Sequence, residues 1–294
     1  MPLRATTPFP IVRRDMATHL PVLGGHAEGF TATARTDAWW QGPLITFVVF
    51  STFVVYTTWA ALQGDHYYAN PYLSPFYSPV LFAEPNALLH GGAAPHMAWF
   101  GDWPSWMPHF LPLSPAVLIL IFPGAFRFTC YYYRKAYYRS FAGSPPGCAV
   151  GPLAGRRKYR GETALLLFQN LHRYAMYFAL LFVFILMRDA FEGFFRFGRP
   201  GIGVGSIVLT VNVVLIACYT FGCHSFRHLI GGRKDCMSDC GKNTVALGSF
   251  RQATWFNARH MLFAWLSLFS VMLTDLYVRL VSMGVIHDFN TWGK

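Results

Sequence analysis

Five apolar stretches, each long enough to cross a bilayer, constrain the fold of this chain more than any other feature. They cover about residues 43–63, 115–138, 163–187, 204–230 and 254–285, and a membrane-spanning helix needs about 20 residues. Of the 294 residues, 54% are hydrophobic and only 13% are charged, against about 25% charged in soluble domains. We therefore predict an all-α integral membrane protein with five transmembrane helices, of which the second to fifth form an up-down bundle.

The lysine and arginine residues between the spans predict the orientation of the chain. Of the 24 lysine and arginine residues, 17 lie in segments 1–40, 134–160 and 227–259. Only five lie in segments 64–112, 188–203 and 279–294. Basic segments stay on the cytoplasmic side. We therefore expect a loosely ordered cytoplasmic arm (1–40), a transmembrane domain (41–286) with a long outer loop (64–112), and an outer C-terminal tail (287–294). The net charge of +11 lies beside the spans, which favours membrane lipid over nucleic acid as its partner.

Thiol and imidazole side chains lie at a similar depth in four of the five spans. With a rise of 1.5 Å per residue, the expected distances from the cytoplasmic helix ends are about 12 Å for Cys130, 13 Å for His172, 10 Å for Cys223 and 9 Å for His260. The first span contains neither residue type. Because ionisable groups at membrane depth are costly, their convergence indicates a cofactor or a partner.

Several chemistries are compatible with this layer. A haem b needs two histidines from facing helices, such as His172 with His228 or His260. A Rieske-type cluster needs two cysteines on one iron and two histidines on the other. The set Cys130, Cys223, His172 and His260 supplies them, with His224 and His228 as substitutes for either imidazole. A zinc site is weaker because the spacing of His224 and His228 lacks the glutamate of the HExxH motif, and four unrelated, satisfied side chains remain a further interpretation.

Four segments together resemble the membrane subunit of the actinobacterial-type succinate dehydrogenase. They are the aromatic and proline-rich residues 67–79, the histidine-bearing residues 168–174, Cys-His-Ser-Phe-Arg-His at 223–228 and Asn-Ala-Arg-His at 257–260. The resemblance implies a five-helix anchor in the bacterial plasma membrane, without a dehydrogenase active site of its own. It also implies a flavoprotein and an iron–sulfur subunit as partners, and electron transfer to quinone, with menaquinone expected. A membrane-embedded Rieske-type 2Fe–2S cluster is implied as well, whereas the assignment of its ligands rests on depth alone.

The quinone pocket has two candidate positions. In the inner half the candidates are Gln169, Arg173 and Asn257; in the outer half they are Asp275 and Arg279, with Arg188 and Asp189 nearby. Asp275 and Arg279 are four residues apart on one helix, so a plain ion pair is the alternative. Cys236 and Cys240 share a cytoplasmic loop and are expected to be reduced thiols, because two ligands do not complete a metal site. The alternatives outside the succinate dehydrogenase anchors are a small transporter or a structural assembly protein. Either of these would lack a redox spectrum.

Overall fold

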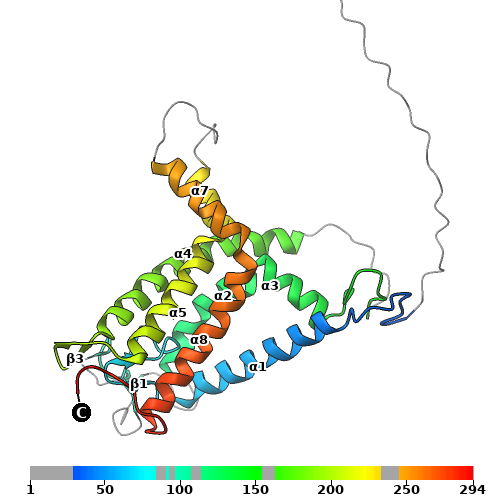
Figure 1. The fold of residues 1–294 in the computed structure, drawn as a ribbon. Coiled ribbons are helices and arrows are strands. Elements are labelled where there is room, and N and C mark those ends of the chain that lie inside the picture. Colours follow the sequence, from blue (N-terminus) through cyan, green and yellow to red (C-terminus); the bar gives the residue numbers. More distant parts are fainter. Residues whose placement is uncertain are drawn as a thin grey trace, which may run out of the picture.

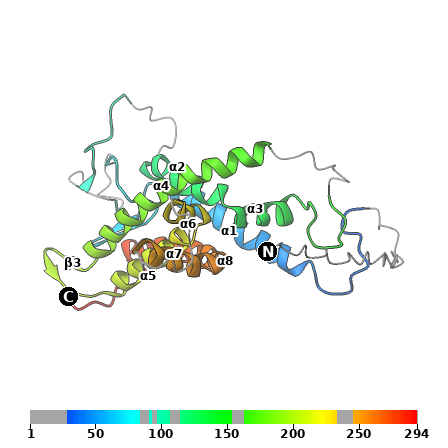
Figure 2. The same cartoon turned by 90° about the horizontal axis from the view of Figure 1, so that it is seen from above.

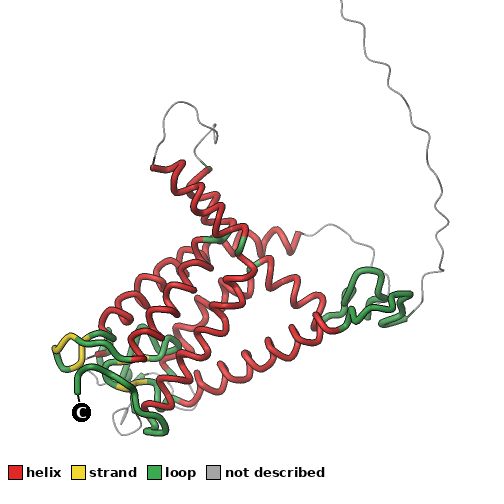
Figure 3. Tube along the Cα trace, in the orientation of Figure 1, coloured by secondary structure: helices red, strands yellow, loops and turns green. Residues whose placement is uncertain are grey.

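The computed structural model describes residues 29–83, 91–92, 97–106, 114–153, 163–232 and 245–293. Helices dominate these residues, and short strands occur only at one end of the bundle (Figure 3). In chain order the helices are α1 (Gln41–Gln63), α2 (Pro115–Thr129), α3 (Tyr131–Ala136), the π-helix η3 (Tyr137–Phe141), α4 (Thr163–Glu192), α5 (Val204–Phe221), α6 (His224–Gly231), α7 (Val245–Ala258) and α8 (His260–Ser282). Two hairpins pair β1 (Tyr68–Ala69) with β2 (Tyr72–Leu73) and β3 (Phe195–Arg196) with β4 (Arg199–Pro200).

Helices α2, α4, α5 and α8 form the bundle, and α1 lies along its side (Figures 1 and 2). Among the described residues, α1, α4, α5 and α8 are long and apolar enough to cross a membrane, and α2 with α3 and η3 adds a fifth crossing if this bent pair is one span. In the most apolar window of α1, 11% of the residues are buried in the protein, against 33–39% in α4, α5 and α8. The first helix is therefore peripheral, and most of its side chains are not covered by the rest of the described chain.

Three of the helical paths are broken at the same end of the bundle, which we call the cysteine end. The α2–α3 path bends by 68° at Cys130, whose φ and ψ are −65° and 132°. The α5–α6 path breaks at Cys223, with nearly the same values of −62° and 137°, and the α7–α8 path breaks at Arg259. The sequence predicted none of these breaks.

The opposite end, called the loop end, is covered by residues 64–83 and by the last residues of the chain. Tyr72 packs so closely on α5 that a Cβ at Gly205 would lie 2.5 Å from its ring, and glycine is therefore required there. The Tyr72 hydroxyl donates to Asp288 at 2.7 Å, and burial, reinforced by this bond, raises the pKa of Tyr72. Asp288 also accepts from Tyr277 and from the backbone N–H of Gly205, so the C-terminal tail caps the start of α5.

A buried ion pair joins α8 to α1 and to the loop at this end. Arg279 Nε donates to Asp275 Oδ2 at 2.7 Å, and both side chains are fully buried. The guanidinium also donates to Gln63 Oε1 and to the carbonyls of Asp65 and Ala60. Asp275 accepts from the hydroxyls of Tyr56 and Ser74. The partners come from α1, from α8 and from the loop that follows α1, so the pair acts as a structural lock between the loop and the bundle.

Residues 29–40 are ordered against the loop that follows η3. Thr31 N–H donates to Gly151 O at 3.1 Å, and Gly151 N–H donates to Ala32 O at 2.9 Å. Arg35 donates to Cys148 O and pairs with Asp37. This part of the predicted arm is thus tied to the end of η3, whereas residues 1–28 lie outside the described residues.

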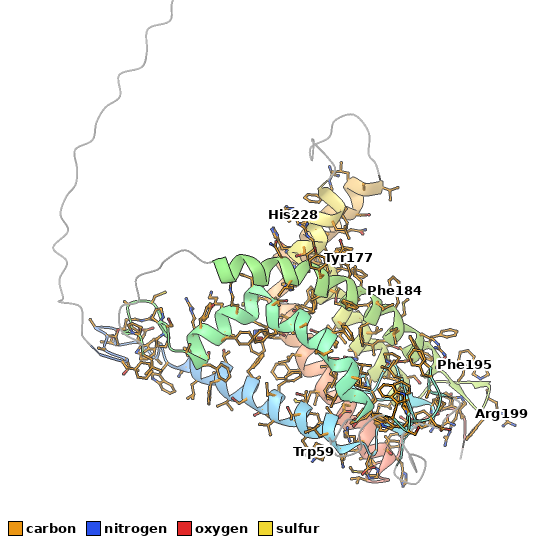
Figure 4. All side chains as sticks on the ribbon, turned by 180° about the vertical axis from the view of Figure 1, so that it is seen from behind. Trp59, Tyr177, Phe184, Phe195, Arg199 and His228 are labelled. Atoms are coloured by element: carbon orange, nitrogen blue, oxygen red, sulfur yellow. The ribbon has the colours of Figure 1, made fainter. Side chains whose placement is uncertain are left out.

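Large apolar side chains cover the outside of the bundle. Tyr177 and Phe184 project from α4, and Trp59 projects from α1 (Figure 4); all three are exposed. An apolar surface this extensive is unusual for a soluble monomer and is ordinary for a protein in lipid.

Candidate functional site

The two cysteines and two histidines predicted to share a depth lie together at the cysteine end. His172 Nε2 is 3.1 Å from Cys223 Sγ, and His260 Nε2 is 3.7 Å from Cys130 Sγ. All four side chains are buried. The first contact joins α4 to the break between α5 and α6. The second joins the break between α2 and α3 to α8. Four helical paths therefore contribute one side chain each.

The helix breaks place three of the four groups. Cys130 and Cys223 are the residues directly before α3 and α6, and His260 is the first residue of α8. In a continuous helix neighbouring side chains point in different directions along the surface; extended backbone at both cysteines instead directs the thiols into the space between the helices. His172 lies within the unbroken α4.

A threonine fixes the orientation of His172. Thr129 Oγ1 lies 2.8 Å from His172 Nδ1, and its hydroxyl also donates to Ala125 O at 2.8 Å. Since the single hydroxyl proton is used on this carbonyl, the oxygen accepts Nδ1–H from the imidazole. His172 Nε2 is then unprotonated and faces the Cys223 thiol.

Two aromatic rings separate the histidines from the middle of the bundle. Phe126 stacks on His172 with ring centroids 4.8 Å apart, and Tyr219 stacks on His260 at the same distance. The Tyr219 hydroxyl and His260 Nδ1 are buried and have no hydrogen-bond partner among the described residues. Unsatisfied polar atoms beside a cluster of cysteines and histidines, side-chain types that can bind metals, are a mark of a functional site.

A cavity of about 520 Å³ lies at this cluster, and all four side chains line it. Arg173 and Asn257, two of the inner quinone candidates, line it. Asn257 Nδ2 donates to Gly222 O at 2.8 Å, so it holds the α5–α6 break. Gln169 lies in α4, but its side chain is outside the described part of the chain.

His224 and His228 form a separate pair on α6. Their Nε2 atoms are 2.9 Å apart, and both residues are exposed at the rim of the cavity. Figure 4 shows His228 at the cysteine end, on the segment that projects from the bundle. The four buried residues rather than this pair therefore form the enclosed cluster.

The remaining sequence candidates lie elsewhere. Asp275 and Arg279 form the lock at the loop end. Arg188 pairs with Glu192 at the surface, and Asp189 accepts from Ser78. Cys236 and Cys240 lie outside the described residues. Within the described ranges, no group of three or more His, Cys, Asp or Glu surrounds a single metal position, and the cluster instead consists of two Cys–His pairs.

Three residues beside the cluster were not found by sequence reasoning: Thr129, Tyr219 and Arg127. Thr129 directly precedes Cys130, and Arg127 lies on the same helix; a polar residue close to a candidate ligand was the available signal for both. Tyr219 carries no such signal, because one aromatic in a chain with 15 tyrosines and 28 phenylalanines does not stand out.

The chain matches the family described as actinobacterial succinate dehydrogenase subunit SdhC over residues 41–284. It belongs to this family. The anchor subunit is also similar to a chain in the solved structure of the Mycobacterium smegmatis Sdh1 complex in the apo form, with 42% sequence identity and a TM-score of 0.76. That similarity covers 89% of this chain and 94% of the other. Among curated proteins, no match was found. The chain is therefore a membrane anchor subunit of an actinobacterial succinate dehydrogenase.

Proposed function

We propose that this subunit carries electrons from an iron–sulfur subunit, through a membrane-embedded Rieske-type 2Fe–2S cluster, to a quinone, with menaquinone as the expected acceptor. The observation that supports this is the buried group of two thiols and two imidazoles, brought together from four helical paths. A flavoprotein subunit that oxidises succinate would supply the electrons.

The residues present fit such a cluster in number and kind. Cys130 and Cys223 would bind one iron, and His172 and His260 the other. Metal-bound histidines usually form a hydrogen bond through the ring nitrogen that does not bind the metal. The bond between His172 Nδ1 and Thr129 fixes the ring of His172 in this way. His260 Nδ1 has no partner among the described residues. A cluster with two imidazole ligands supplies a one-electron carrier of higher potential than an all-cysteine cluster.

The protein around the cluster would exclude water and set a direction for electron transfer. Phe126 and Tyr219 cover the two histidines on the side of the bundle centre. The same two rings line an apolar cavity of about 300 Å³ that lies on the other side of them. Flat, apolar ligands favour such cavities, so we place the quinone ring there or in the cavity that Arg173 and Asn257 line.

The cysteine end is proposed to face the cytoplasm. The α6–α7 segment projects from the bundle at this end (Figure 1) and carries Arg227, Arg251 and Arg259. Basic segments remain on the cytoplasmic side, where the iron–sulfur subunit would dock. Protease added to sealed, inside-out vesicles should spare loop 64–112. Cleavage of that loop from the cytoplasmic side would reverse the orientation.

Spectroscopy and a double substitution test the electron route. The purified complex should show a rhombic two-iron EPR signal after reduction and no Soret band; a stoichiometric Soret band would favour haem b instead. His172→Ala with His260→Ala should abolish quinone reduction and the EPR signal, because two ligands are lost. Succinate oxidation by an artificial dye should persist, since the dye takes electrons from the soluble subunits. Cys148→Ala, at an exposed free thiol, is the control. Normal quinone reduction by an assembled double variant would contradict the proposal.

A further inference from the structure

Arg127 is a half-buried cation of the helical bundle, beside the cluster of cysteines and histidines. It lies on α2 one turn before Cys130. Its guanidinium donates to the Tyr133 hydroxyl at 2.8 Å, to Ser267 Oγ at 2.9 Å and to the Ala264 carbonyl at 3.3 Å. All three acceptors are neutral, and within the described residues no carboxylate forms a salt bridge with Arg127.

Arg279, which is fully buried, shows by comparison what is unusual about Arg127. Arg279 is paired with Asp275 at 2.7 Å, so its charge is cancelled locally. Arg127 instead keeps its full positive charge at a depth where an unpaired charge is costly. Neutral hydrogen-bond partners hold the guanidinium in place without neutralising it, which is the arrangement required if the charge itself has a role.

The charge is close to the cluster of ligand candidates. The guanidinium carbon lies 4.8 Å from the centre of the Tyr219 ring, and the Tyr219 ring is 4.8 Å from the His260 ring and inclined to it by only 17°. Arg127 also lines the apolar cavity beyond that ring. One aromatic ring therefore separates the cation from His260.

We propose that the fixed positive charge of Arg127 stabilises the electron that the cluster receives. This charge therefore raises the reduction potential of the cluster. The inference rests on the proposed function. One electron arrives from the iron–sulfur partner subunit and leaves to quinone, and Arg127 neither gains nor loses a proton or a bond. At an effective dielectric constant of about 20, a unit charge about 10 Å away shifts a one-electron equilibrium roughly fifteenfold.

The test is an EPR-monitored redox titration of the whole complex with Arg127→Gln, Arg127→Met and Arg127→Lys. The two neutral variants should lower the ratio of reduced to oxidised cluster about fifteenfold at a fixed potential, which is about 70 mV in midpoint for a one-electron couple. Arg127→Lys should stay within a few-fold of the unaltered complex, because it keeps the charge. Arg139→Gln removes an exposed arginine on η3 that does not line the cavity at the cluster, and it should change the ratio little, since solvent screens its charge.

The outcomes separate the two proposals. A two-iron signal with the same midpoint in the neutral variants would overturn the role of Arg127 and leave the cluster intact. Loss of the signal from both neutral variants, with Arg127→Lys normal, would show a structural requirement for the cation and would also overturn the inference. If the unaltered complex has no two-iron signal, the proposed function itself fails, and this inference fails with it.

Discussion

Replacing Arg279 with methionine should destabilise the subunit far more than removal of an ordinary ion pair does. The side chain is 1% exposed and that of Asp275 is 0% exposed. Four donated hydrogen bonds are lost, to Asp275, Gln63, Asp65 and Ala60. Removing one member of a buried pair typically costs about 3–5 kcal/mol because the remaining charge is stranded. The carboxylate keeps its bonds from Tyr56 and Ser74, so we expect a value inside this range.

A surface pair in the same protein provides the matched control. Arg188 and Glu192 have the same spacing of four residues and the same 2.7 Å separation, but their side chains are 62% and 52% exposed. Arg188→Met should therefore cost less than about 1 kcal/mol. With an effect of roughly 2–4 °C per kcal/mol, thermal unfolding of the purified complex should show a fall of about 10 °C for Arg279→Met and little change for Arg188→Met.

The double variant Asp275→Leu with Arg279→Met sharpens this prediction. Because it leaves no buried charge unpaired, it should be more stable than Arg279→Met alone. The reasoning is refuted if Arg279→Met and Arg188→Met lower the melting temperature equally, or if the double variant is the least stable of the three. Retained stability of Arg279→Met with lost quinone reduction would instead support a role for this pair in quinone binding.

Three further predictions concern the packing around the site and the ends of the helices. Thr129→Val should reduce quinone reduction about tenfold, with dye-linked succinate oxidation unchanged, because the isosteric side chain cannot accept from His172; unchanged quinone reduction would count against this orientation. Gly222→Ala places a Cβ about 3 Å from two backbone carbonyls and should cost about 1–3 kcal/mol in thermal unfolding, whereas Gly248→Ala meets nothing within 4 Å and should be neutral or stabilising. Asp288→Asn removes the charge at the start of α5 and should lower stability by about 1–2 kcal/mol, and an unaltered melting temperature would contradict its capping role.

The residues of the site were predictable from the sequence because depth in a membrane can be counted. Helices of constant rise that begin at known interfaces place Cys130, His172, Cys223 and His260 at one level, and the structure brings these four together. Their role as ligands stays a prediction. The polar lock at the loop end was only half visible: the spacing of Asp275 and Arg279 suggested an ion pair, but its burial depends on loop residues far away in the chain.

The helix breaks could not be predicted from local sequence. Residues 127–133 contain neither proline nor glycine, the usual causes of a sharp kink, and the same holds around Arg259. Gly222 was the one local signal, and it directly precedes Cys223. Tertiary contacts decide these positions, including the bond from Asn257 to the Gly222 carbonyl. The role of Asn257 at this break was therefore also invisible at the sequence level.

The breaks and the chemistry of the site depend on each other. Non-helical backbone at membrane depth is tolerated only where protein buries it and satisfies its polar groups. Cys130 and Cys223 are 2% and 1% exposed, and Asn257 satisfies the carbonyl freed at Gly222. In continuous helices, each thiol would lie on the surface of its own helix. The breaks instead place both thiols at helix ends that lie close to each other. The bundle thus loses helical hydrogen bonds at one level, and at that level two thiols and two imidazoles converge between the helices.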